Sequence, residues 1–284
     1  MTVKKLRDIG HAPFFAKCVV KRMVAMNKQQ QYQKLIADVK AFYSAQGGAH
    51  KNEPVYLTWY GDCDEINLWT YWQGRGNLDA KIMLVGQDWG APKDAAKLYM
   101  AQFAEINDGK RTSYRLDEKS DTDKNLIELF RSLDPDYDIS NGKQRHPDLF
   151  FTNFVLGYRN KGFSGNFQTR WLKENQEFFF RLANIIEPKV IICLGRSAFR
   201  GVMMAFGRKV RIGRYNTFIT GKDNPVEVTL ASGKKAFVFA EAHCGVMGTL
   251  NRNRLKDPDG MTGIDLQKKD WERIREYIKN GKAR

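Results

Sequence analysis

Three polar side chains in this sequence lie within or just after short apolar runs, and their chemical types suit binding and reaction. Asp88 comes soon after the apolar run in KIMLVGQDWG, Asn153 lies near the end of the apolar run 149–154 in LFFTNFVLGYR, and His243 lies in FVFAEAHCGVMG. A carboxylate or an imidazole can stabilise charge or exchange protons, and a carboxamide offers one donor side and one acceptor side. If folding brings the three together, they form a site that can hold a polar ligand and act on it.

The elements that would position these residues are short strands. Four apolar runs predict strands at 82–85, 149–154, 190–194 and 236–240, and helical patterns such as DKNLIELFRSL and WLKENQEFFFRLANII separate them. Strands that alternate with helices are typical of a parallel sheet covered on both faces. Because ligands bind at the carboxyl ends of such strands, Asp88, Asn153 and His243 are expected at one edge of the sheet.

Each of the three residues also has an ordinary structural explanation. An aspartate after a strand is often a helix N-cap, and an asparagine late in a strand often satisfies loop backbone. A single histidine beside cysteine and glycine is often structural. Three independent structural roles would give no reason for Asp88, Asn153 and His243 to share one edge, so the shared position favours a site.

The predicted fold is α/β, with three α/β/α layers and a central, mostly parallel four-stranded sheet. Helical periodicity at 28–46, closed by Gly47 and Gly48, predicts an N-terminal helix that packs on the main body or, as the alternative, binds a partner. Residues 265–280 predict a closing amphipathic helix. The stretch 214–240 is hairpin-like, which predicts an antiparallel strand before the last core strand. We therefore divide the chain into an N-terminal extension at 1–75, helical and rich in aromatics, and an α/β domain at 76–284.

Composition narrows the class of protein. Lys and Arg total 47 against 32 acidic residues, giving a net charge of +15 and a pI near 9.6. Such an excess favours a polyanionic partner, although a soluble basic enzyme with no such partner has the same composition. The four cysteines are far apart without a CxxC pair, and the sequence shows neither a signal peptide nor a membrane-length apolar run. We expect a reduced, cytoplasmic protein without a metal site.

Four segments together resemble the uracil-DNA glycosylase superfamily. LVGQDWG, FTNFVLGYR, EPKVIICLGRSAF and AHCGVMG occur in the order of that superfamily's motifs, and the resemblance covers about residues 80 to 250. It implies a DNA glycosylase that removes uracil or another deaminated base by hydrolysis of the N-glycosidic bond, without a metal or cofactor. The iron–sulfur branch of the superfamily is disfavoured because its clustered cysteines are missing.

The resemblance implies roles around the base. Asp88 would stabilise the oxocarbenium-like sugar and orient water, and His243 would donate to a carbonyl oxygen of the departing base. Asn153 would read the pyrimidine edge, and the backbone of Gln87 would line the pocket. Trp89 stands where the family has proline, and it either narrows the pocket or simply packs.

Further residues are implied to contact DNA. Met247 takes the position of the family's intercalating side chain, with packing on the core as the alternative. Arg196 and Ser197 begin a helix whose free amides favour a phosphate, and Lys161 and Ser164 belong to a basic loop. For both of these segments the alternative is an ordinary solvated cap or loop.

This chain departs from the family pattern at several positions. The family's loop prolines and serine are replaced by Cys244, Gly245 and Val246, and Gly90 stands where one branch has tyrosine. The aromatic that would stack on the base is one of Tyr99, Phe103 and Tyr114, of which Tyr114 is also a candidate DNA contact. Two alternatives to a glycosylase therefore stay open: a DNA-binding or regulatory protein that keeps the fold without catalysis, and a hydrolase of free nucleosides or nucleotides.

Overall fold

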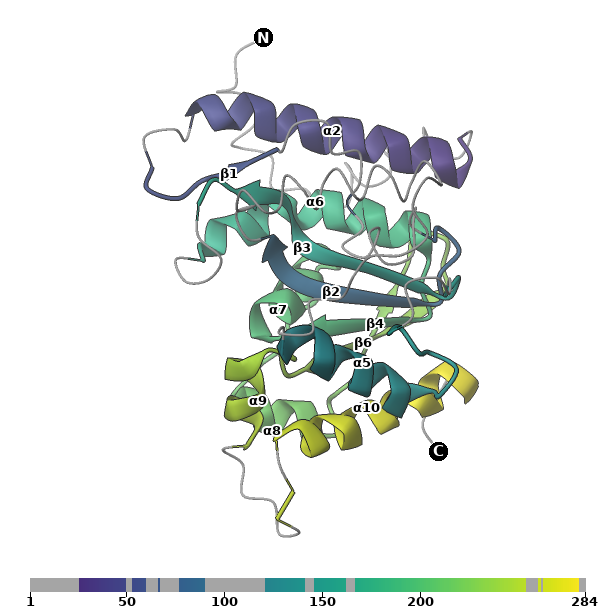
Figure 1. Ribbon diagram of the computed structural model, residues 1–284. Helices are drawn as coiled ribbons and strands as arrows, with labels where there is room; N and C mark the ends of the chain where they lie inside the picture. Colours follow the sequence, from purple (N-terminus) through teal and green to yellow (C-terminus); the bar gives the residue numbers. More distant parts are fainter. Residues whose placement is uncertain are drawn as a thin grey trace.

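The computed structural model describes the chain over residues 26–49, 53–59, 66, 77–89, 121–140, 146–161, 167–253, 260–261 and 263–280. These residues form an α/β fold built on one six-stranded sheet (Figure 1). The strands are β1 (Leu57–Thr58), β2 (Ile82–Trp89), β3 (Leu149–Arg159), β4 (Val190–Leu194), β5 (Val226–Thr229) and β6 (Lys235–Glu241).

The sheet is mixed and mostly parallel. Its strand order is β1-β3-β2-β4-β6-β5, in which the four inner strands are parallel and the two outer strands pair antiparallel with their neighbours. The predicted parallel sheet is thus confirmed, and so is the antiparallel strand before β6. The predicted number of four strands is wrong, because β1 and β5 add one strand at each edge.

Strands β2 and β3 run further than their apolar cores suggest. The parallel ladder between them continues from Ile82, opposite Leu149, to Asp88, opposite Val155, and irregularly on to Trp89. The prediction that this strand ends at Val85 is therefore wrong. Backbone hydrogen bonds to β3 hold the polar end of β2 in an extended conformation, and β1 in turn pairs with the end of β3.

The described residues form seven helices, and those predicted at 28–46, 123–133, 171–186 and 265–280 are confirmed. The helices are α2 (Lys28–Ala49), α5 (Asp121–Leu133), α6 (Thr169–Ile186), α7 (Arg196–Ala205), α8 (Tyr215–Thr220), α9 (Val246–Asn253) and α10 (Gly263–Asn280). Helix α2 continues through Gly47 and Gly48, where it was expected to end. Helix α6 ends at Ile186 and is capped by Glu187, which has a left-handed φ of 55° and directly precedes Pro188.

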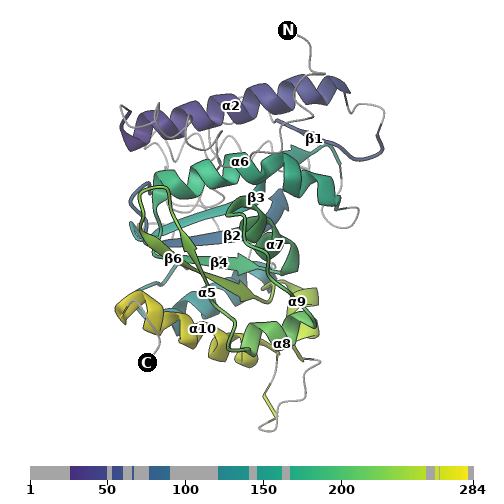
Figure 2. The ribbon, with the colours of Figure 1, turned by 180° about the vertical axis from the view of Figure 1, so that it is seen from behind.

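Helices lie on both faces of the sheet, over two separate apolar cores (Figures 1 and 2). Side chains of a strand alternate between faces, so Met83 and Val85 join the core under α2, α6 and α7. Ile82 and Leu84 join the core under α5 and α10. Loops therefore leave the sheet at the ends of its strands, and the set of carboxyl ends of the parallel strands is the edge meant below.

Helix α2 belongs to the main body, as predicted. Tyr32, Leu35, Ile36 and Val39 are buried in the same core as α6, and the ring of Tyr32 meets Phe150 of β3 edge-on. Among the described helices, none combines the length and apolar character needed to cross a bilayer.

Candidate functional site

The first part of the candidate site is a close approach between β2 and β3. Gly86 lies opposite Asn153 in the ladder, and a Cβ added at position 86 would be 2.1 Å from the Asn153 Oδ1. Asn153 lies in the middle of β3 and not near its end as expected, and it is only 4% exposed. Glycine at position 86 therefore provides the space in which the Asn153 carboxamide lies.

Asp88 lies within β2, so it is neither a helix cap nor a loop residue. Its Oδ2 pairs with Nε of Arg159, and the two side chains are 5% and 1% exposed. Its Oδ1 accepts a 2.7 Å hydrogen bond from Gln87 Nε2. The carboxylate is thus held in one orientation by a buried cation that the sequence analysis did not include in the site.

Aromatic rings surround this ion pair. The Arg159 guanidinium carbon lies 5.4 Å from the ring centre of Trp171 on α6, a cation–π arrangement. Trp89 packs on Tyr158 with ring centres 4.9 Å apart and an interplanar angle of 32°. Within the described residues the indole N–H of Trp89 has no hydrogen-bond acceptor. Trp89 therefore packs on Tyr158, and its predicted part in narrowing a pocket stays a prediction.

His243 lies just beyond β6 and is held as one tautomer. Its Nδ1 accepts a 2.9 Å hydrogen bond from the Gly245 backbone N–H, so the neutral ring carries its proton on Nε2. The residue is exposed, yet the surrounding protein displaces water from part of the ring, and this desolvation lowers the pKa of His243 below its usual value. The imidazole is therefore a neutral Nε2–H donor near neutral pH.

The backbone of the His243 loop is fixed by side chains of two helices. Gln267 of α10 donates to the His243 carbonyl at 3.0 Å, and Asn125 of α5 donates to the Cys244 carbonyl at 2.7 Å. Gly248 lies so close that an added Cβ would be 1.9 Å from the His243 carbonyl oxygen. Although the loop lacks prolines, these contacts give it one defined conformation.

Glu241, at the end of β6, is a buried carboxyl group that the sequence analysis missed. Its side chain is 2% exposed, and within the described residues its Oε2 has no hydrogen-bond partner. Burial, together with the nearby charge of Asp270, raises the pKa of Glu241 well above its usual value. Arg252 makes hydrogen bonds of 2.7 and 2.9 Å to Asp270, so we assign the negative charge to Asp270 and the proton to Glu241. The one sequence signal was an acidic residue ending an apolar run.

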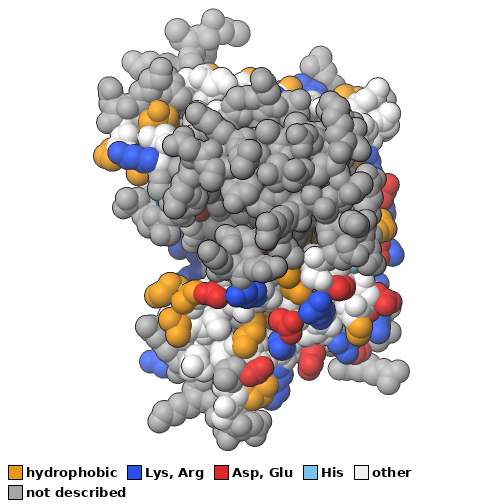
Figure 3. All heavy atoms as spheres, in the orientation of Figure 1, with side chains coloured by type: hydrophobic (Ala, Val, Ile, Leu, Met, Phe, Trp, Pro, Cys, Tyr) orange, Lys and Arg blue, Asp and Glu red, His pale blue; other side chains and the backbone are white. Residues whose placement is uncertain are grey.

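An exposed apolar patch adjoins the His243 loop. Val246, Met247 and Leu250 of α9 are 51%, 65% and 52% exposed. Figure 3 shows hydrophobic side chains gathered where α9 reaches the surface. Met247 thus points away from the core, and the alternative that it packs on the core is wrong.

The predicted phosphate contacts are only partly described. Arg196 is exposed at the first residue of α7, and its Nη2 donates to the Ile212 carbonyl at 3.1 Å. Ser197 follows it half-buried, and Lys161 is exposed just after β3. Outside the described residues lie Ser164, Gly90 and the three candidate stacking aromatics, Tyr99, Phe103 and Tyr114.

The sheet order relates the three predicted residues. Asn153 and Asp88 lie on adjacent strands, whereas β4 stands between β2 and the strand that precedes His243. At the end of β4, a Cβ added to Gly195 would be 3.9 Å from the His243 Cβ. The parallel strands therefore direct Asp88 and His243 towards the same edge, with Gly195 between them and Asn153 deeper in the sheet.

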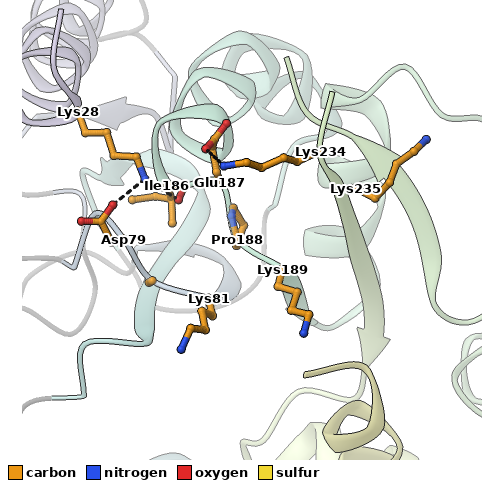
Figure 4. A pocket seen from close by; sticks show the side chains of 10 residues that line it. Lys28, Asp79, Lys81, Ile186, Glu187, Pro188, Lys189, Lys234 and Lys235 are labelled. Atoms are coloured by element: carbon orange, nitrogen blue, oxygen red, sulfur yellow. Dashed lines mark hydrogen bonds and ion pairs between the residues drawn. The ribbon is translucent and has the colours of Figure 1, made fainter. Parts of the chain in front are cut away.

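A pocket at the opposite edge, beside the amino ends of the parallel strands, is rich in charge (Figure 4). It has a volume of about 420 Å³ and is lined by Lys28, Asp79, Ala80, Lys81, Ile186, Glu187, Pro188, Lys189, Lys234 and Lys235. Four of its five lysines pair with a carboxylate: Lys28 with Asp79, Lys81 with Asp148, Lys234 with Glu187 and Lys235 with Glu227. This pairing leaves little positive charge to hold a ligand.

No group of three or more His, Cys, Asp or Glu residues in the described part of the chain is arranged to hold a metal ion. Cys193 and Cys244 are free and buried. Comparison of the sequence with protein-family models found none that matches, and a search of curated proteins found no relative.

Proposed function

We propose that this protein is a DNA glycosylase that removes uracil or another deaminated base, using the carboxyl edge of a three-layer α/β/α domain. The observation that carries the proposal is His243, a neutral Nε2–H donor fixed at the same edge as Asp88. A neutral imidazole that donates a hydrogen bond stabilises negative charge on a departing base oxygen. The order of the sequence motifs adds the expectation that the ligand is a nucleobase in DNA.

In this mechanism the bond between the base nitrogen and the sugar C1′ breaks, and its electron pair leaves with the base. Nε2–H of His243 stabilises the resulting oxyanion, and the Asn153 carboxamide pairs with the pyrimidine edge. Water adds to C1′, and its proton ends on the base, so the products are a free base and an abasic sugar. The carboxylate of Asp88 favours the cationic sugar.

Arg159 has a defined part in this arrangement. The guanidinium holds the Asp88 carboxylate in one orientation, because the two side chains form a buried ion pair. A carboxylate oxygen can accept more than one hydrogen bond, so contacts to Arg159 and Gln87 leave accepting capacity for a water molecule.

The target base must leave the helix to reach this edge. Met247, exposed beside the His243 loop, is the side chain that would fill the vacated space in the duplex. The net charge of +15 supports binding to the phosphate backbone.

A second candidate function is DNA binding without base removal. The ion pair between Asp88 and Arg159 favours it, because the guanidinium neutralises much of the charge with which the carboxylate would stabilise a cationic sugar. Such a protein would still bind DNA through its net positive charge and the exposed apolar side chains of α9, whereas Asp88 would have only a structural role.

One assay separates these functions. The full chain is incubated with a labelled duplex that contains one uracil, and with a matched duplex that contains thymine. Strand cleavage after alkali treatment, seen only with uracil and lost in Asp88→Asn and His243→Ala, supports the glycosylase. Binding of both duplexes without cleavage supports the second candidate. Release of base from free nucleosides, with no action on DNA, contradicts both and indicates a nucleoside hydrolase.

A further inference from the structure

A strongly basic stretch of the chain, on α7 and the residues that follow it, has no part in the proposed mechanism. Between positions 196 and 214 the chain carries six basic residues and no acidic one. The stretch comprises α7 and the segment that connects it to α8, which Figure 2 shows from behind.

Part of this stretch forms a cleft with a volume of about 650 Å³. Its lining comes from the carboxyl half of α7 and the residues that follow: Arg200, Met203, Met204, Gly207, Arg208, Lys209, Val210, Arg211 and Ile212. Four of these residues are cationic and four are large apolar residues. The cleft therefore combines positive charge with apolar surface.

The two kinds of side chain occupy different levels of the cleft. Met203 is buried, and Met204, Val210 and Ile212 are half-buried and pack against the core beneath α7. The four cationic residues are all exposed, and none of them forms an ion pair with a described residue. Their charge thus stays available above an apolar floor.

The cleft is linked to the edge that carries the proposed site. The guanidinium of Arg196 donates to the carbonyl of Ile212, a lining residue, at 3.1 Å. Arg196 itself follows the end of β4, beside Gly195 and the His243 loop. An extended ligand that passes Arg196 at this edge can therefore continue directly into the cleft.

We propose that this cleft binds single-stranded nucleic acid, its phosphates on the cationic rim and its bases on the apolar floor. That the bound nucleic acid runs from the His243 edge into the cleft rests on the proposed function, whereas binding in the cleft does not require base removal. Unpaired bases expose flat apolar faces that pack on such a floor, while a duplex presents mainly phosphate and sugar. The substrate class of the proposed glycosylase would then include DNA with a single-stranded segment beside the target base.

The test measures binding of fluorescent oligothymidylate, which contains no uracil, by anisotropy over a series of salt concentrations. The cleft variant is Arg208→Gln, Lys209→Gln and Arg211→Gln, all exposed positions whose change should not disturb folding. The matched control is Lys124→Gln, Lys173→Gln and Lys279→Gln, which removes the same charge from exposed positions elsewhere. Each lost phosphate contact should reduce the slope of log affinity against log salt by about 0.7.

We expect the cleft variant to bind oligothymidylate about tenfold more weakly than the control, with a slope smaller by about 2. Binding of a blunt duplex should change equally in the two variants. Equal affinity of both variants for oligothymidylate overturns the proposal. A cleft variant whose binding of duplex falls as much as its binding of single strands also overturns it. The same holds if an acidic peptide displaces the fluorescent oligothymidylate and unlabelled single-stranded DNA without abasic sites does not. Because no uracil is present, failure of the glycosylase assay leaves this result unaffected.

Discussion

The carboxamide of Asn153 occupies the space that a side chain at position 86 would need, since a Cβ there would lie 2.1 Å from its Oδ1. The two residues face each other in the β2–β3 ladder, and Asn153 is almost fully shielded from water. The glycine is therefore a condition for the position of the amide that would read a base edge.

Gly86→Ala should displace the Asn153 side chain and destabilise the fold by about 1–3 kcal/mol, the usual cost of overpacking. Combined with Asn153→Ala, the same substitution should cost much less, because the clash partner is gone. Urea unfolding of the two single variants and the double variant measures this coupling. Additive effects would show that the clash is relieved in some other way.

Removal of one partner from the Asp88–Arg159 pair leaves a buried charge uncompensated. Arg159→Met should therefore lower the free energy of unfolding by about 3–5 kcal/mol. The control is Arg131→Met, whose pairs with Glu128 and Asp138 are exposed and should each contribute at most about 1 kcal/mol. Similar losses in both variants would contradict a special role of burial at Arg159.

Asp88→Asn keeps the shape of the side chain but removes its charge. If the proposed function holds, turnover of a uracil-containing duplex should fall by a factor of about 10²–10³ or more, the scale of a positioned electrostatic group. The single-turnover rate is the measurement, with DNA affinity recorded alongside. An Asp88→Asn enzyme that cleaves at the rate of the parent refutes the catalytic assignment.

Gln267 donates to the His243 carbonyl and accepts from the Thr249 hydroxyl, so with respect to the proposed site it is a positioning residue. If the proposed function holds, Gln267→Met should lower kcat about 10²-fold with little change in KM, because displacement of the imidazole by about 1 Å is costly. Asn216→Ala is the control, since its amide donates to the Asn251 carbonyl of α9 and not to the His243 carbonyl. A matching loss in the control would indicate a general effect on α9.

The His243 ring should be a neutral Nε2–H tautomer with a pKa below 6.5. Long-range ¹H–¹⁵N correlation spectra across a pH series, with His243→Gln for assignment, measure both properties. Because the pKa is lowered in the folded state, this residue favours folding above about pH 6.5, and the contribution is lost as the pH falls through the folded value. An Nδ1–H tautomer would contradict the proposed donor.

Glu241 gives the opposite pH dependence. Its folded pKa lies above 4.5, so the folded state binds the proton more tightly, and stability should decrease as the pH rises from about 4.5 towards that folded pKa. Glu241→Gln imitates the protonated acid and should remove this decrease. Urea unfolding of both proteins at several pH values above 4.5 tests the prediction. Parallel curves would mean that Glu241 is ionised in the folded protein.

Much of the fold could be predicted because strong apolar periodicity marks both helices and inner strands. The run VIICL gives β4 directly, and the spacing of α6 gives its buried face. The ends of β2 and β3 could not be predicted, because Asp88 and Arg159 are extended only through pairing with neighbouring strands.

The candidate site was predictable only in part for a similar reason. Position along the chain placed Asp88 and His243 at one edge, as the parallel topology requires. The partner of Asp88 is 71 residues away, and Gln267, which fixes the His243 backbone, is 24 residues away. Such pairings depend on tertiary packing and leave no local pattern in the sequence.

The residues that hold Asp88 and the residues that hold the His243 loop lie on opposite faces of the sheet. Arg159 reaches Trp171 in the layer of α6, while Gln267 and Asn125 reach the His243 loop from α10 and α5. A substitution inside one layer can therefore adjust the aim of one group while the other keeps its geometry. If the proposed function holds, the group that faces the sugar and the group that faces the departing base could each change without disturbing the other.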